Sequence, residues 1–144
     1  MKNILEQVII LLLIVMFSYA AISKLLDYDI SLLQLKKSEF LTRFAEFISW
    51  SIPGLELLTC TFLIIPKWRL AGLYCSFGLM LLFTGYIIMI LNFAEQVPCS
   101  CGGILEHMSW KQHLIFNIVF LLLTIYATLN FLGSNQEASR TPVK

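Results

Sequence analysis

Two cysteines separated by one residue, Cys99 and Cys101, form the most concentrated group of reactive side chains in the sequence. A disulfide between residues this close in sequence closes a very small ring, and the strain makes the bond easier to reduce than a structural disulfide. Pro98 precedes the pair and Gly102 and Gly103 follow it, so the backbone can turn sharply and leave both sulfurs approachable. This pattern favours a pair that exchanges electrons with a partner.

Two histidines that follow the cysteines widen the possible chemistry. His107 is placed to stabilise a thiolate or to carry a proton during exchange. A zinc or copper site built from Cys99, Cys101, His107 and His113 is a second interpretation, although the spacing matches no standard structural zinc set. Ordinary loop cysteines are a third. The leading hypothesis takes Cys99, Cys101 and His107 as catalytic residues and assigns no metal.

The composition is that of a membrane protein. Of the 144 residues, 58% are hydrophobic and 13% are charged, whereas a soluble domain has about 25% charged residues. The net charge of +1 provides no basic surface for a nucleic-acid backbone. Nucleic-acid binding is therefore excluded, and the lipid bilayer is the expected surrounding.

Four stretches are long and apolar enough to cross that bilayer. A span needs about 20 apolar residues, and it must be helical because lipid offers no partners for backbone polar groups. The predicted crossings are about 4–26, 48–66, 69–92 and 111–132. We therefore predict an all-α membrane protein whose residues 1–132 form a four-helix transmembrane bundle, followed by a disordered polar tail over 133–144.

The first crossing also passes for a signal peptide, because Ser18-Tyr19-Ala20 offers a small-residue cleavage site. Its apolar residues continue to Leu26, however, which gives it full spanning length. We expect it to be retained.

Residues 29–46 predict an amphipathic helix in the membrane interface, with Asp29 as its N-cap. Its apolar and charged side chains repeat near helical spacing on largely different sides. This helix either covers the mouth of the bundle or provides a face for a partner, and both interpretations stay open.

The short turn with Lys67 and Arg69 has no acidic neighbour and sets the predicted orientation, because short basic loops tend to stay in the cytoplasm. Both termini are then cytoplasmic. The Cys-x-Cys loop then lies on the outer face, which is the oxidising periplasm if the source is a Gram-negative bacterium.

Glu56 is the one charged residue of the second crossing, and a carboxylate at that depth needs a partner. Lys24, near the outer end of the first crossing, is long enough to reach it. A Lys24–Glu56 pair either locks two helices together or forms the polar core of a proton or ligand site. Pro53 and Gly54, just before Glu56, predict a locally opened helix there.

Cys60 and Cys75 fall at similar depth in the predicted helical hairpin, so they are candidates for a second thiol pair, although buried cysteine more commonly packs as a small hydrophobe. Trp110 and Phe93, near the ends of the last two crossings, could stack on a quinone ring. Simple anchoring of aromatic side chains in the interface explains them more simply.

Three motifs, taken in order, resemble the MauE branch of the DoxX-like membrane proteins: Ser23-Lys24-Leu25, Pro53-Gly54-x-Glu56 and Pro98-Cys99-Ser100-Cys101-Gly102-Gly103. The resemblance covers the chain to about Leu132. It implies a four-helix inner-membrane protein associated with periplasmic disulfide chemistry.

The leading functional hypothesis is therefore a membrane thiol–disulfide oxidoreductase, or the membrane component of a disulfide relay, that exchanges electrons with a thioredoxin-like or secreted thiol protein. Electrons would pass on to a quinone or to Cys60 and Cys75. The alternatives are a non-catalytic assembly or small-ligand-binding subunit built on the Lys24–Glu56 core, and a metal-delivery protein.

Overall fold

The computed structural model describes residues 4–37, 42–93 and 109–140, and these residues are almost entirely helical. Within them, the predicted all-helical fold is confirmed: there are five α-helices and no strand. Four helices are long and apolar enough to span a membrane. The elements are α1 (Ile4–Leu26), α2 (Tyr28–Lys37), a 3₁₀ turn (Thr42–Phe44), α3 (Ala45–Ile64), a second 3₁₀ turn (Pro66–Trp68), α4 (Arg69–Phe93) and α5 (Trp110–Arg140).

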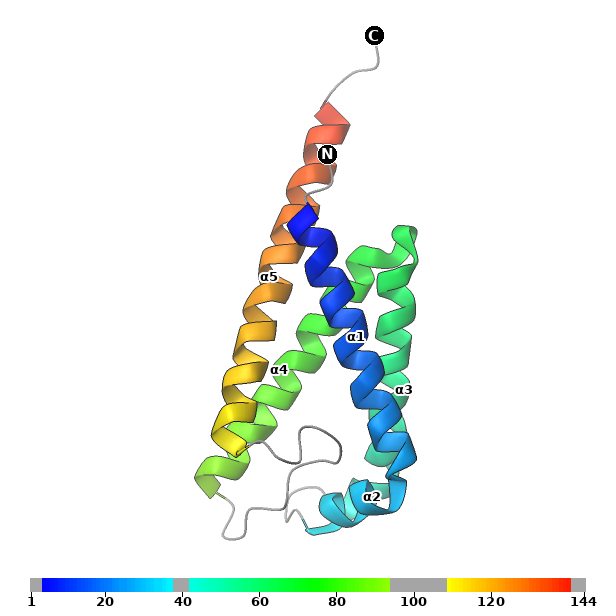
Figure 1. Ribbon diagram of the computed structural model, residues 1–144, viewed down its shortest axis with the longest axis vertical. Helices are drawn as coiled ribbons and strands as arrows, with labels where there is room; N and C mark the ends of the chain where they lie inside the picture. Colours follow the sequence, from blue (N-terminus) through cyan, green and yellow to red (C-terminus); the bar gives the residue numbers. More distant parts are fainter. Residues whose placement is uncertain (1–3, 38–41, 94–108, 141–144) are drawn as a thin grey trace.

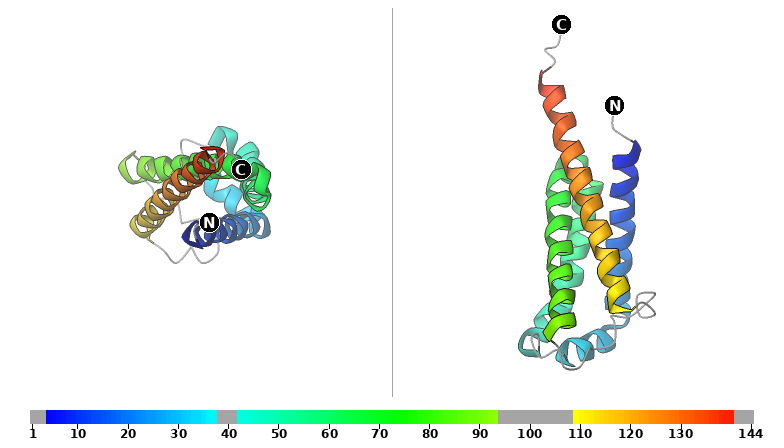
Figure 2. Two further views of the ribbon diagram at one scale, coloured as in Figure 1. Left: turned by 90° about the horizontal axis from the view of Figure 1, so that it is seen from above. Right: turned by 90° about the vertical axis from the view of Figure 1, so that its left-hand side faces the viewer.

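The four long helices run side by side, and both ends of the described chain lie at the same end of the bundle (Figure 1). The short α2 lies across the opposite end, where α4 finishes and α5 starts (Figures 1 and 2). α1 packs mainly against α3, and α4 against α5, while α3 and α4 are joined by a short turn. The bundle is thus two helix pairs linked through the α3–α4 hairpin.

The interior of the bundle is lined by one face of each helix. On α1 the buried residues Ile9, Leu13 and Phe17 recur every four positions, which places them on one helical face. Residues on the opposite side of α1, such as Leu12 and Val15, are exposed although they are apolar. Apolar side chains on both the inner and the outer face suit a bundle surrounded by lipid, because lipid solvates apolar side chains as well as the core does.

α2 is held onto the start of α3 by aromatic and polar contacts. The rings of Tyr28 and Trp50 lie 5.3 Å apart between centroids, and the Ser49 hydroxyl donates a hydrogen bond to the Tyr28 hydroxyl at 3.3 Å. These contacts fix α2 across the end of the bundle.

The segment between the first two crossings differs from the prediction of one helix over 29–46. α2 already begins at Tyr28 and ends at Lys37, and Ala45 belongs to α3. Asp29 therefore lies in the first turn of α2 rather than at its N-cap. Ala45 is only 1% exposed, so the buried face of the membrane-crossing helix already begins there. Ala45 and Glu46 therefore belong to α3, although the surface pattern had assigned them to the interfacial helix.

The end of the chain also differs from the prediction, because α5 continues to Arg140 instead of ending at 132 before a disordered tail. The single Gly133 costs a helix only about 1 kcal/mol relative to alanine. Good helix formers follow it, and the next proline is Pro142. Nothing between 133 and 140 is therefore strong enough to stop the helix.

Pro53 does not open α3 as the sequence had suggested, since the helix is continuous from Ala45 to Ile64. Proline removes one backbone N–H and normally kinks or breaks a soluble helix. In transmembrane helices it is tolerated because packing and neighbouring groups compensate for the lost bond. Pro53 is indeed buried against the rest of the bundle.

Gly72 allows a close approach between α3 and α4. A Cβ at this position would lie 2.8 Å from the backbone nitrogen of Leu63 and 3.0 Å from its side chain. The glycine is therefore required by the hairpin's packing, as small residues commonly are where transmembrane helices meet.

Replacing Gly72 with alanine is expected to lower the free energy of unfolding by about 1–3 kcal/mol, because the added methyl forces two backbones apart. Gly78→Ala is the matched control, since a Cβ there meets nothing within 4 Å, and it should be neutral or stabilising by up to about 1 kcal/mol. Thermal unfolding in detergent measures both. Equal effects of the two substitutions would contradict the close approach.

Candidate functional site

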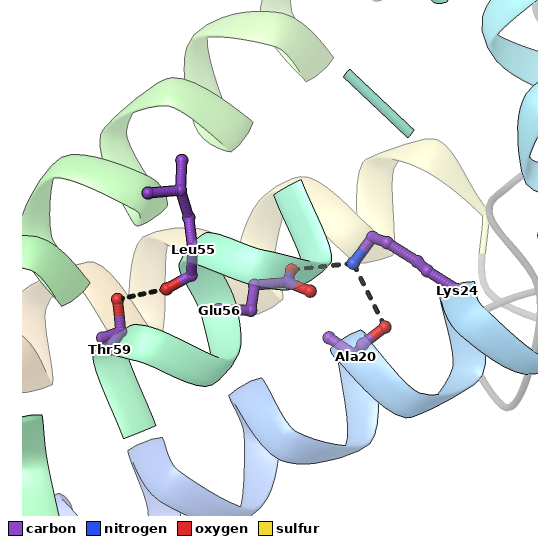
Figure 3. A network of polar contacts seen from close by, with 5 residues as sticks. All are labelled: Ala20, Lys24, Leu55, Glu56 and Thr59. Carbon is purple, nitrogen blue, oxygen red and sulfur yellow. Dashed lines mark hydrogen bonds and ion pairs between the residues drawn. The ribbon is translucent and has the colours of Figure 1, made fainter. Parts of the chain in front are cut away.

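An ion pair joins α1 and α3 inside the bundle. The Lys24 ammonium nitrogen lies 2.7 Å from Oε1 of Glu56, as Figure 3 shows. Glu56 is completely buried, and the Lys24 side chain is 21% exposed. The structure thus brings together the two charged residues that the sequence had singled out, from positions 32 residues apart.

The position of Lys24 follows from helix geometry. It lies in the last turn of α1, where the helix dipole favours a positive charge. Its ammonium also donates a hydrogen bond to the carbonyl oxygen of Ala20, one turn earlier, at 3.3 Å. The long side chain therefore reaches back along α1 into the bundle, toward Glu56 (Figure 3).

The position of Glu56 is set by the buried face of α3. Pro53, Glu56, Thr59 and Leu63 recur every three or four residues, and all are buried. The Thr59 hydroxyl is satisfied locally, because it donates to the Leu55 carbonyl oxygen at 2.8 Å (Figure 3). Glu56 is therefore the one member of this face that carries a charge into the core.

A third long helix also contacts this pair. The Lys24 ammonium lies 5.4 Å from the centre of the Phe83 ring on α4, within the range of a cation–π interaction. Lys24 therefore interacts with residues of α3 and α4 as well as with its own helix.

Four buried polar atoms have no hydrogen-bond partner among the described residues: Oε2 of Glu56, Nδ1 of His113, Nδ2 of Asn117 and, on α2, Oγ of Ser31. His113 and Asn117 lie one turn apart on α5 and so share a face. More than nine in ten buried polar groups in proteins are satisfied, commonly by water or a ligand where the protein offers no partner. The polar core, meaning Lys24, Glu56, His113 and Asn117, is therefore equipped to bind a further polar group.

The predicted catalytic residues Cys99, Cys101 and His107 lie outside the described residues. The helix ends that flank them are described: α4 ends at Phe93, and α5 begins at Trp110. Both ends lie at the α2 end of the bundle (Figure 1). The ring of Trp110, the aromatic residue proposed for quinone stacking, lies 6.4 Å from that of His113 between centroids, and this contact links the start of α5 to the polar core.

Cys60 and Cys75 are both free thiols. The Cys60 sulfur lies 3.4 Å from the Ser18 hydroxyl and donates to the carbonyl oxygen of Ile14 at 3.6 Å, so it is engaged with α1. It also belongs to the hydrophobic core cluster. These contacts favour a packing role for Cys60, and the structure does not join it to Cys75.

No group of three or more His, Cys, Asp or Glu side chains in the described part of the chain is arranged to hold a metal ion. Of the four ligands in the zinc or copper interpretation, His113 alone is described. The metal interpretation therefore remains a prediction about residues outside the described ranges.

The profile of the family described as methylamine utilisation protein MauE matches residues 2–130. The chain belongs to the MauE family. Neither a search of curated proteins nor one of solved structures gives a match.

Sequence reasoning missed part of the polar core of this MauE family member. Asn117 was not singled out, and His113 was considered only as a metal ligand. The signal was present, because both are polar residues at helical spacing inside an apolar crossing, and such residues usually face a bundle interior. Assigning them to the same core as Lys24 required the arrangement of α5 against α1.

Removing one partner of the buried pair is expected to be strongly destabilising. Lys24→Met leaves the Glu56 charge uncompensated in the core and should lower the free energy of unfolding by about 3–5 kcal/mol. The double substitution Lys24→Met with Glu56→Met should recover most of that loss, because it removes both charges. Chemical unfolding in detergent provides the measurement.

Lys36→Met is the matched control, because Lys36 pairs with Glu46 at 3.4 Å with both side chains well exposed. It should change stability by less than about 1 kcal/mol. A double variant that is no more stable than Lys24→Met would contradict the pairing.

Proposed function

We propose that this MauE family member is the membrane component of a thiol–disulfide relay in which Cys99 and Cys101 exchange electrons with a partner protein. The observation that supports this most directly is the Cys-x-Cys pair in a chain of this family, between α4 and α5. The flanking residues Phe93 and Trp110 lie at a bundle end, where water-soluble partners can reach.

In the proposed exchange, two electrons pass from the partner protein to the Cys99–Cys101 disulfide. A thiolate of a thioredoxin-like or secreted partner attacks one sulfur of the Cys99–Cys101 disulfide, forming a mixed disulfide and releasing the other cysteine as a thiolate. The second thiol of the partner then resolves the mixed disulfide. The partner is oxidised to a disulfide, and Cys99 and Cys101 are reduced to thiols by two electrons. His107, a few residues on, carries a proton during exchange.

Reoxidation of the pair needs a two-electron acceptor, for which we propose a quinone. The dithiol of Cys99 and Cys101 would lose two electrons and two protons, and the quinone would become a hydroquinone. Trp110 and Phe93 flank the cysteine segment at the ends of their helices, where an aromatic ring could stack on the quinone. Cys60 and Cys75 are the alternative acceptor, although the contacts of Cys60 with α1 make it less accessible.

We propose a bacterial inner membrane as the location, with both termini in the cytoplasm and the cysteine segment in the periplasm. The support is the short basic turn of Lys67 and Arg69 between α3 and α4. This turn lies at the opposite end of the bundle from α2 (Figure 1). The cysteines would then meet oxidising conditions.

Thiol trapping in membranes tests the relay. Cys99→Ser and Cys101→Ser should each abolish oxidation of the partner while leaving the folded protein intact, because neither variant can form the disulfide that the partner attacks. A partner that keeps its attacking cysteine but lacks its second thiol should accumulate a mixed disulfide with the native protein. The bond would be seen as a reducible shift on a gel. Ser100→Ala is the matched control, because it changes the residue between the two cysteines and leaves both thiols in place. Full partner oxidation in the Cys99→Ser, Cys101→Ser double variant would overturn the proposal.

The polar core supports a second candidate function, a non-catalytic subunit that holds a small polar ligand. The specific observation is that three of the four buried polar atoms without partners in the described chain belong to the polar core, on Glu56, His113 and Asn117. A ligand there would need a donor for the Glu56 oxygen and an acceptor for the Asn117 nitrogen.

Variants of Asn117 and of the cysteines distinguish the ligand-binding function from the relay. Asn117→Leu should abolish cellular function while thiol trapping stays normal if the ligand is what matters. The cysteine variants should then leave function intact. The opposite pattern supports the relay and excludes the ligand-binding role.

A further inference from the structure

A groove of about 380 Å³ lies between α1 and the α3–α4 turn, away from the polar core. Ile10 and Ile14 of α1 contribute apolar walls, and Ile10 is only 4% exposed. Leu11 of α1 and Ile64 of α3 lie at 60% and 59% exposure. Since these two residues face the outside of the bundle, the groove is accessible from the surrounding lipid.

Two polar side chains complete the groove, Gln7 of α1 and Arg69 at the start of α4. Arg69 is half-buried, and its Nε donates to the Leu63 carbonyl oxygen at 3.3 Å. The guanidinium group has further N–H donors that this bond does not use. Neither of the two ion pairs among the described residues includes Arg69.

The charges near the groove favour an anion. Lys67 lies in the same turn as Arg69 and is exposed, and residues 57–70 contain no acid. Glu6 precedes Gln7 on α1, but it is only 2% exposed on the core side and forms no ion pair with Arg69. With Lys67 and Arg69 against the one carboxylate of Glu6, the polar end of the groove therefore has a net positive charge.

The groove lies where a phospholipid headgroup would be. α1 starts at Ile4 and α4 at Arg69, so Gln7 and Arg69 are each within the first turn or so of a spanning helix, at the bundle end that bears both termini (Figure 1). From there the apolar residues of α1 continue toward the membrane centre through Ile14. The groove thus has a polar end near the membrane surface and apolar walls deeper in the membrane. A phospholipid has the same order, with its phosphate at the surface and its acyl chain below.

We propose that this groove binds an anionic phospholipid, with its phosphate on Arg69 and Gln7 and an acyl chain along Ile10, Leu11, Ile14 and Ile64. Basic pockets between transmembrane helices are suited to anionic headgroups. An anionic lipid is favoured over a zwitterionic one, because a choline cation would be placed near Arg69 and Lys67. This proposal is independent of the thiol chemistry.

The headgroup contact is tested by titrating phosphatidylglycerol into the full-length protein in detergent and counting bound lipid by native mass spectrometry. Arg69→Gln should weaken binding about tenfold, which corresponds to about 1.4 kcal/mol. Lys67→Gln removes the same charge two residues away, outside the groove lining, and should weaken binding less than about twofold. Equal losses in the two variants would overturn the proposal, because they indicate diffuse attraction to a basic turn.

The chain contact is tested by filling the groove. Leu11→Trp should weaken phosphatidylglycerol binding, while Leu12→Trp should leave it unchanged, since Leu12 is also exposed but does not line the groove. Binding that survives Leu11→Trp, or that phosphatidylcholine matches, contradicts the proposal. Competition by inorganic phosphate at concentrations equal to the lipid would also overturn it, because the site would then bind phosphate without the acyl chain.

Discussion

A charged group in the hydrocarbon region of a membrane is stable only when the protein supplies its partner, and this constraint organises the bundle around Lys24 and Glu56. The fully buried carboxylate of α3 obtains its positive charge from the last turn of α1, at 2.7 Å. Desolvation of two charges is so costly that the net contribution of such a pair to stability can be small. Its consequence is specificity, since other arrangements of α1 against α3 would leave Glu56 alone in an apolar interior.

The two ends of the bundle, one bearing α2 and the other the α3–α4 turn, differ in their chemistry. Toward α2, the ammonium of Lys24 contacts the ring of Phe83, and His113 lies beside Trp110 at the start of α5. The proposed redox segment connects α4 and α5 at this same end. At the other end, the short basic turn and the groove beside Arg69 face the opposite membrane surface. The two proposals thus place thiol exchange at one membrane surface and lipid binding at the other.

Much of this architecture could be predicted because lipid imposes simple rules on sequence. Runs of about 20 apolar residues must be helices, and Glu56 in such a run must find a cation, for which Lys24 was within reach. The end of α2 could not be predicted, because Ala45 is buried and belongs to the next helix although the surface pattern continues through it. The end of α5 could not be predicted, because Gly133 is too weak a helix breaker to stop it. The roles of His113 and Asn117 depend on how α5 packs against α1, which no local pattern contains. Cys99, Cys101 and His107 lie outside the described residues and remain predictions.

The proposed relay depends most on which membrane surface exposes the cysteine pair. In intact bacterial cells that produce a Cys60→Ala, Cys75→Ala variant, a membrane-impermeant maleimide applied after reduction should label Cys99 and Cys101 without permeabilisation. A Lys67→Cys reporter, placed in the opposite turn of a chain whose native cysteines are all replaced, should be labelled only after the membrane is opened. Labelling of Cys99 and Cys101 that requires permeabilisation would place the pair in the reducing compartment or inside the bundle, and would contradict the proposed relay.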